Sequence, residues 1–146
     1  MSRAHVHREL GLRINREIWN ERRFERIPAY FSEDFVADYS PYAIHRGHAA
    51  LRAMVERAHA TFEGFREEVR TVVADESSVV VHFTIRGRQV GPWGPVPPTG
   101  REVAFDEIVI MTIVDGRVVH QVGVVDNLRG LQQLGVLPGP KADTPA

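Results

Sequence analysis

The stretch TGREVAFDEIVIMTIVDGRVVHQVGVVD, residues 99–126, decides the fold. It holds the dipeptide Asp115-Gly116 between two apolar runs rich in β-branched residues. A two-residue Asp-Gly loop favours a type I′ turn, because both central residues can take positive φ and the twist of that turn matches the twist of the strands. The stretch therefore predicts a β-hairpin whose register is fixed by the turn.

Counted outward from the turn, this register predicts four opposed pairs: Val114 with Arg117, Met111 with His120, Glu107 with Val124, and Phe105 with Asp126. Successive side chains alternate between the two faces of a strand. One face is then formed by Phe105, Glu107, Val109, Met111, His120, Val122, Val124 and Asp126. Both faces are largely apolar, so we expect both to be covered. Glu107 and Asp126 would lie diagonally, about 5–8 Å apart, and acids on a covered face are rare enough to suggest chemistry.

Composition narrows the classes of protein that fit. The 146 residues are 43% hydrophobic and 25% charged, and the net charge of −1 argues against a nucleic-acid binder with a basic surface. The absence of cysteine excludes disulfides, thiol nucleophiles and thiolate metal sites. No apolar run is long enough to span a membrane, and no signal-peptide core is visible, so we expect a cytoplasmic protein without a membrane partner.

Periodicity predicts helices before the hairpin and again after it. Apolar residues recur every four positions over 6–20, a shorter helix fits 24–30, and a third begins at Gly47 and ends at Gly64. Strands are predicted over 65–74, where Glu67 shares a face with Val69, and over 79–86. A last helix covers 128–134. This order indicates one α+β domain, residues 1–138, with helices on one face of a curved, antiparallel sheet and a disordered Pro-rich tail over 139–146.

A loop dense in glycine and proline, residues 87–100, joins the second strand to the hairpin and carries Trp93. Long loops in compact domains are commonly functional. Trp93 is predicted to fold over an apolar ligand, or to pack on the protein's own surface or on a second subunit.

Several short segments, taken in order, resemble the SnoaL-like polyketide cyclases of the nuclear transport factor 2-like (cystatin-like α+β) superfamily. They are Ile18-Trp19-Asn20, the run YFSEDFV at 30–36, Arg46-Gly47, PPTGR at 97–101, DGRVV at 115–119, DNLRGL at 126–131 and Gln133-Leu134-Gly135. The resemblance implies N-terminal helices on a strongly curved, mainly antiparallel sheet that forms a cone with an internal apolar pocket. It also implies a homodimer formed through the sheets.

In this family, the resemblance implies, an aspartate at the position of Asp126 acts as general acid and base in an intramolecular aldol ring closure, without metal or cofactor. The polar set around it differs here. Gln121-Val122 replaces a His-Trp pair, Asp38 replaces a histidine, and His82-Phe83 replaces an arginine and a tryptophan. Substrate and reaction can have changed with these residues.

Three acids are the catalytic candidates: Asp126, Glu107 and Asp38. Asp126 has an alternative role as the N-cap of the last helix, a bulge could turn Glu107 outward, and Asp38 could lie on the surface. The predicted substrate pocket consists of Tyr39, Tyr42, His48, Trp93, Phe105, Val109, Val122 and Val124. His82 is expected on the outer sheet face at a dimer interface, and no histidine spacing indicates a metal site.

Three functions fit these patterns. The first is a cofactor-independent enzyme that cyclises an apolar, polyketide-like molecule by aldol chemistry. The second uses the same carboxylates for epoxide opening or isomerisation, where we expect an arginine bridging two acids. The third is a ligand-binding domain without turnover. Both enzyme hypotheses require Asp126 to point into a closed apolar cavity.

Overall fold

The computed structural model describes residues 1–140, and most of the tail predicted to be disordered lies outside this range. The helical elements are α1 (Arg3–Arg13), the π-helix η1 (Ile14–Asn20), the 3₁₀ turn η2 (Phe24–Arg26), α2 (Ile27–Tyr30), α3 (Gly47–Thr61) and α4 (Asn127–Gln133). The strands are β1 (Phe31–Tyr39), β2 (Ala43–Arg46), β3 (Phe62–Ala74), β4 (Ser78–Gln89), β5 (Glu102–Val114) and β6 (Arg117–Val125).

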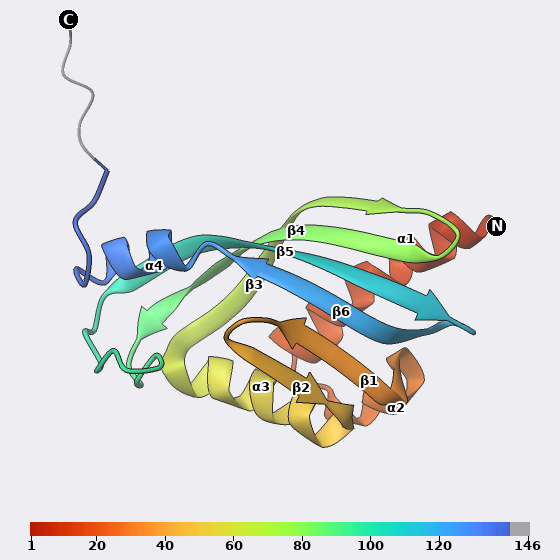
Figure 1. The fold of residues 1–146 in the computed structure, drawn as a ribbon, viewed down its shortest axis with the longest axis horizontal. Coiled ribbons are helices and arrows are strands. Elements are labelled where there is room, and N and C mark those ends of the chain that lie inside the picture. The colour runs from red at the N-terminus through yellow and green to blue at the C-terminus, as the bar shows by residue number, and fades with distance from the viewer. Residues whose placement is uncertain (141–146) are drawn as a thin grey trace, which may run out of the picture.

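The six strands form one open sheet in the order β2-β1-β6-β5-β4-β3. β1 runs parallel to β6, and every other neighbouring pair is antiparallel. Figure 1 shows α3 beside β1 and β2 on one side of the sheet, and α4 at the far end of β5 and β6. The predicted α+β class with a mainly antiparallel sheet is confirmed.

The core lies between the helices and one face of the sheet. On β4, Val79, Val81 and Phe83 alternate inward and are at most 2% exposed. Leu10, Ile14 and Ile18 of the predicted apolar repeat are buried in the same core, whereas Val6 is exposed. Gly11 allows α1 to approach β4, since a Cβ there would lie 2.9 Å from Val79 Cγ2. We call this side the inner face of the sheet and the opposite side the outer face.

The hairpin turn forms as predicted, but the strand register beyond the turn differs from the predicted register. Asp115 and Gly116 have φ values of 49° and 77°, and Val114 pairs with Arg117. The next pairs are Ile113 with Val118 and Thr112 with His120, so Val119 is an extra residue in β6. Such a β-bulge shifts all later pairs by one residue, which turns each side chain of β6 to the other face.

The bulge corrects several predicted positions. Met111 lies opposite Gln121 and Glu107 lies opposite Val125, in place of His120 and Val124. Gln121 therefore points inward and is 3% exposed, whereas Val122 and Val124 lie on the outer face, 37% and 68% exposed. The prediction that these two valines line the pocket is wrong, and so is the pairing of Phe105 with Asp126.

Within residues 1–140, no helix is both long enough and apolar enough to cross a membrane.

Candidate active site

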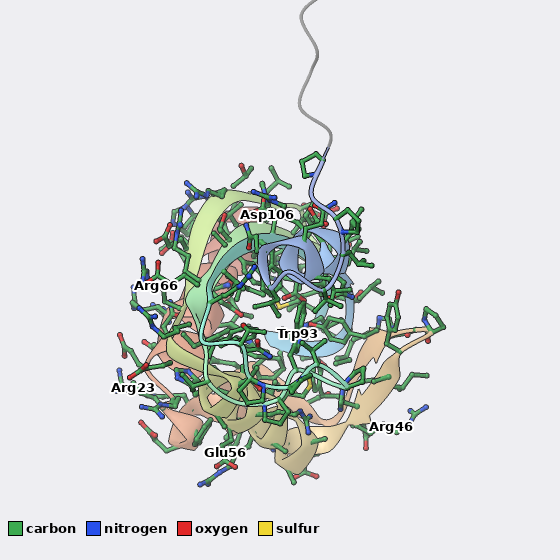
Figure 2. The ribbon with its side chains drawn as sticks, turned by 90° about the vertical axis from the view of Figure 1, so that its left-hand side faces the viewer. Arg23, Arg46, Glu56, Arg66, Trp93 and Asp106 are labelled. Carbon is green, nitrogen blue, oxygen red and sulfur yellow. The ribbon has the colours of Figure 1, made fainter. Side chains whose placement is uncertain are left out.

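A cavity of about 260 Å³ opens between the inner face of the sheet, α3 and the loop that carries Trp93. Figure 2 looks onto this end of the molecule, with Trp93 near the centre of the view. The walls of the cavity are mainly apolar and are formed by Trp19, Met54, Ala58, Phe62, Phe65, Ile85, Pro92, Trp93, Phe105 and Val125. A cavity with such walls suits an apolar small molecule.

Two acids from different strands lie at the inner end of this cavity. Glu67 comes from β3 and Glu107 from β5, and they are 5% and 7% exposed. Both also line a narrow extension deeper in the core, together with Asn15, Gln121 and other residues. The predicted pair of Glu107 and Asp126 is therefore wrong, because Asp126 does not line the cavity and the second acid is Glu67.

The surroundings of the two acids differ. Asn15 Nδ2 donates a hydrogen bond to Glu67 Oε2, and the Asn20 side chain holds the backbone of Glu67 with bonds of 2.7 and 3.0 Å. By contrast, Glu107 Oε1 is buried and has no hydrogen-bond partner within residues 1–140. A buried carboxylate oxygen without a partner is costly and therefore uncommon. Glu107 is the acid of the pair with an oxygen left for a ligand.

Burial controls the ionisation of both groups. Desolvation raises the pKa of Glu107 to about 7, and the nearby Tyr39 hydroxyl offsets part of this rise. The pKa of Glu67 is also raised well above its ordinary value, first by burial and then by the charge of Glu107, although the bond from Asn15 lowers it. Two neighbouring acids resist ionising together. With a pKa of about 7, Glu107 can gain and lose a proton near neutral pH, and the raised pKa of Glu67 disfavours its charged form.

Tyr39 completes the polar end of the cavity. Its hydroxyl accepts a 2.8 Å hydrogen bond from Gln121 Nε2, and burial followed by the charge of Glu107 raises the pKa of Tyr39 well above its ordinary value. The ring fits because position 123 on β6 is glycine. A Cβ there would lie 2.0 Å from Tyr39 Cε1. Gly123 thus sets where the tyrosine hydroxyl can lie.

The loop between β4 and β5 forms one wall and is held in place by Gln89. This fully buried side chain donates to the carbonyl oxygens of Val96 and Pro97 and accepts from the backbone and hydroxyl of Thr99. Trp93 stacks on Phe105 with ring centroids 5.2 Å apart. Trp93 therefore lies against the protein's own aromatic residues and also forms part of the cavity wall.

Five predicted site residues line the cavity or its deeper extension: Glu107, Tyr39, Trp93, Phe105 and Val109. The others lie elsewhere. Asp126 is exposed and caps α4, where its Oδ1 accepts a 3.0 Å hydrogen bond from the backbone N–H of Arg129. Its predicted placement on the buried face is wrong, because the bulge in β6 turns it outward.

Three more predicted residues are outside the cavity. Asp38 holds the turn after β1 by accepting a 2.9 Å bond from the backbone N–H of Ser40, and hydrogen bonding from Ser40 lowers the pKa of Asp38. Tyr42 is 80% exposed. His48 Nε2 donates to the carbonyl oxygen of Phe31 at 2.8 Å. Asp38 and His48 are thus engaged in local hydrogen bonds, and the Tyr42 side chain is exposed to solvent.

The residues that were not predicted include Glu67, Asn15 and Arg57. Glu67 carried a signal, because it shares a face with Val69 and so is an acid on an apolar side of a strand. Asn15 lies in η1, inside a stretch that periodicity describes only as an amphipathic helix. Its contact with Glu67 joins residues 52 positions apart.

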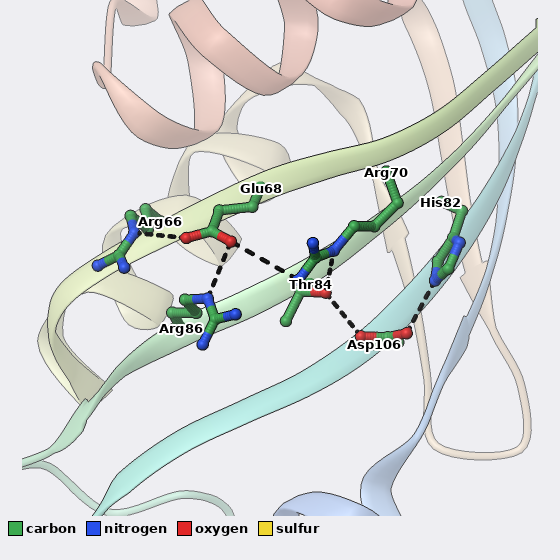
Figure 3. Close-up of polar contacts among 7 residues, drawn as sticks. All are labelled: Arg66, Glu68, Arg70, His82, Thr84, Arg86 and Asp106. Atoms are coloured by element: carbon green, nitrogen blue, oxygen red, sulfur yellow. Dashed lines mark hydrogen bonds and ion pairs between the residues drawn. The ribbon is translucent and has the colours of Figure 1, made fainter.

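The outer face of the sheet carries a separate polar cluster (Figure 3). Asp106 accepts hydrogen bonds from His82 Nε2 and Thr84 Oγ1, each 2.8 Å long, and the bond from His82 lowers the pKa of Asp106. Arg70 donates to the same threonine at 2.9 Å. Since this cluster is on the opposite side of the sheet from the cavity, it is not part of the site. The outer-face position predicted for His82 is confirmed.

Within residues 1–140, no group of three or more histidine, aspartate or glutamate side chains is arranged to hold a metal ion.

This α+β fold, with its open six-stranded sheet, places two acids at the inner end of an apolar cavity. Residues 9–134 match the family of SnoaL-like polyketide cyclases, and the chain belongs to this family, as its resemblance predicted. The chain is 30% identical over 120 residues to nogalonic acid methyl ester cyclase of Streptomyces nogalater, and the match covers 80% of this chain and 89% of that protein.

Solved structures share the fold. A SnoaL-like protein from Jannaschia sp. CCS1 superposes with a TM-score of 0.84 at 21% identity, covering 94% of this chain and 97% of that one. TsrD from Streptomyces laurentii gives 0.82 at 26% identity, with 91% and 97% covered. An LEH-like epoxide hydrolase from M. tuberculosis gives 0.71 at 15% identity, with 91% and 92% covered, which shows a common fold alone.

Proposed function

We propose that this chain is a cofactor-independent enzyme that cyclises an apolar, polyketide-like molecule by an intramolecular aldol reaction, with Glu107 as the proton-transfer residue. The observation that carries the proposal is the buried Glu107 oxygen that has no hydrogen-bond partner within residues 1–140 and belongs to an acid lining an apolar cavity. A carboxyl group with a pKa of about 7 exchanges protons efficiently at neutral pH.

The proposed reaction needs no added reactant. The Glu107 carboxylate removes a proton from a carbon next to a carbonyl group, which leaves an enolate. The enolate carbon forms a bond to a second carbonyl carbon of the same molecule, whose oxygen takes the electron pair. Glu107 then returns the proton to this alkoxide. The Tyr39 hydroxyl is suited to donate a hydrogen bond to the developing oxyanion.

Glu67 supports this role because its charged form is disfavoured. Burial and then the charge of Glu107 raise the pKa of Glu67 well above its ordinary value. Two neighbouring acids resist ionising together, so a single negative charge is present, and it passes from Glu107 to the enolate and alkoxide oxygens and back.

The requirement that Asp126 point into the cavity is not met, so the proposal assigns to Glu107 the role that the resemblance implies for Asp126. The exposed position of Asp126 supports a capping function and gives it no contact with the cavity. Epoxide opening remains the alternative with the same carboxylates. It is less well supported because no arginine is among the groups that act on the ionisation of Glu67 or Glu107.

The test compares three proteins in one assay. The first substrates to try are nogalonic acid methyl ester, the compound in the name of the Streptomyces nogalater relative, and the corresponding free acid. We expect Glu107→Gln to lower kcat by about 10²–10⁴-fold, the usual contribution of a proton-transfer residue. Asp126→Asn removes the carboxylate but keeps a good helix cap, so it should leave kcat within about twofold. The reverse pattern would assign the chemistry to Asp126, and no effect of Glu107→Gln on an active enzyme would refute the proposal.

A non-catalytic binding domain makes a different prediction. Such a domain would retain a ligand in the cavity, and none of the proteins would catalyse ring closure. Glu107→Gln would then change only the affinity for the ligand. Mass spectrometry of the product distinguishes ring closure from epoxide hydrolysis, because hydrolysis adds one water and aldol addition is isomeric.

A further inference from the structure

The mouth of the cavity has a chemical character opposite to that of its inner end. Arg57 and His45 both line the cavity. Arg57 projects from α3, three residues after Met54 and one before Ala58, so it lies on the side of the helix that forms the wall. His45 projects from β2 and lies edge-on to Tyr39, with ring centroids 6.4 Å apart. The exposed Arg57 and the half-buried His45 place two nitrogen donors at the entrance.

Arg57 has no competing partner within the described part of the chain. It forms none of the ion pairs found among residues 1–140. Arg52, five residues earlier on α3, differs, because it pairs with Glu56 at 2.8 Å and lies over the Phe24 ring. The guanidinium of Arg57 is thus left for a ligand, whereas that of Arg52 is already engaged.

The cation and the acids occupy separate ends of the cavity. The charge of Arg57 acts on His45, whose pKa is lowered first by burial and then by this arginine. Arg57 is not among the groups that shift the pKa of Glu107 or Glu67. A molecule that reaches from the mouth to Glu107 would therefore meet a positive charge at one end and a proton-transfer group at the other.

We infer that the molecule bound in this cavity carries a free carboxylate, which Arg57 binds at the mouth with a second hydrogen bond from His45, while its apolar body extends to Glu107. This inference rests on the proposed use of the cavity as a substrate site. Arginine is suited to the role, because its planar guanidinium offers paired donors to a carboxylate. The chain would then prefer an acid over the corresponding methyl ester.

The experiment measures binding and needs no turnover. Anthracene-2-carboxylate and its methyl ester are titrated into the full chain and followed by anthracene fluorescence. We expect the carboxylate to bind about tenfold more tightly than the ester, which corresponds to one charge-assisted hydrogen bond partly exposed to solvent. Raising the salt from about 20 to about 200 mM should weaken carboxylate binding alone.

Matched variants locate the contact. Arg57→Gln should cost about tenfold in affinity for the carboxylate and less than about twofold for the ester, and Arg52→Gln on the same helix should change neither. Circular dichroism checks that both variants fold. Equal affinities of the two probes, absence of binding by both, or equal losses in Arg57→Gln would overturn the inference. Failure of the Glu107 assay would leave these binding results unaffected, so the two proposals fail separately.

Discussion

The carboxyl group of Glu107 is buried beside apolar side chains, and this burial makes the stability of the fold depend on pH. Burial raises its pKa from 4.5 to about 7, so between these two pH values the folded chain binds more protons than the unfolded chain. The contribution of Glu107 to the free energy of unfolding is then fully present below about pH 4.5 and is lost as the pH rises through about 7. Burial also raises the pKa of Glu67, so Glu67 contributes to this pH dependence with the same sign.

We predict that Glu107→Gln removes part of this pH dependence. A rise of this size corresponds to a loss on the order of 3 kcal/mol on going to alkaline pH. Urea unfolding at pH 5 and pH 8.5 measures the difference for each protein, and the variant should show the smaller one. The exposed Glu76, changed to glutamine, is the matched control. An unchanged pH dependence in Glu107→Gln would mean that Glu107 is solvated in the folded chain.

Strand β6 determines which side chains enter the cavity. Its extra residue, Val119, moves Gln121 to the inner face, and the next inward residue, Gly123, leaves the space that the Tyr39 ring occupies. Val125, opposite Glu107, then forms part of the wall. A single strand thus places Tyr39 and Gln121 relative to Glu107 through one bulge and one missing side chain.

We predict that Gly123→Ala displaces Tyr39 and destabilises the fold by about 1–3 kcal/mol, the usual cost of an added methyl group in a packed site. When Tyr39 is already replaced by leucine, adding Gly123→Ala should cost much less. The double variant should therefore be nearly as stable as Tyr39→Leu alone. Denaturant unfolding of the four proteins in a double-mutant cycle gives the coupling energy. Additive effects would show that the methyl group does not compete with the ring.

At the scale of the whole molecule, the outer face of the sheet carries an exposed apolar patch formed by Ile108, Ile110, Val122 and Val124, each 37–68% exposed. Apolar patches of this kind commonly mark interfaces. We propose that a second copy of the chain covers this patch, as the family resemblance implies. The cluster of His82 and Asp106 (Figure 3) is on the same face, and His82 lies opposite Ile108 in the register of β4 and β5.

The expected mass in sedimentation equilibrium is twice that of the 16.5 kDa chain. Ile110→Glu should give a folded monomer, because it would bury a charge without a partner in the interface. Val6→Glu, at an exposed valine of α1, is the control and should leave the dimer intact. A wild-type protein that remains monomeric at high concentration would contradict the proposed interface.

The sequence by itself determined the parts of this protein that depend on local rules. The Asp115-Gly116 turn, the four-residue apolar repeat of the first helix and the alternation in β4 follow from backbone sterics and from burial of one face. Glu107 could be identified for the same reason, as an acid within an apolar strand pattern.

The tertiary structure decided the rest. Neither Asp115-Gly116 nor the flanking residues predict the bulge at Val119. This one extra residue places Gln121, Val122, Val124 and Asp126 on the opposite faces of the sheet from those predicted. The contacts of Glu67 with Asn15 and of Tyr39 with Gly123 join residues 52 and 84 positions apart in the chain, as 67 − 15 and 123 − 39. Such contacts depend on how strands and helices meet in space, and a local pattern carries no information about that meeting.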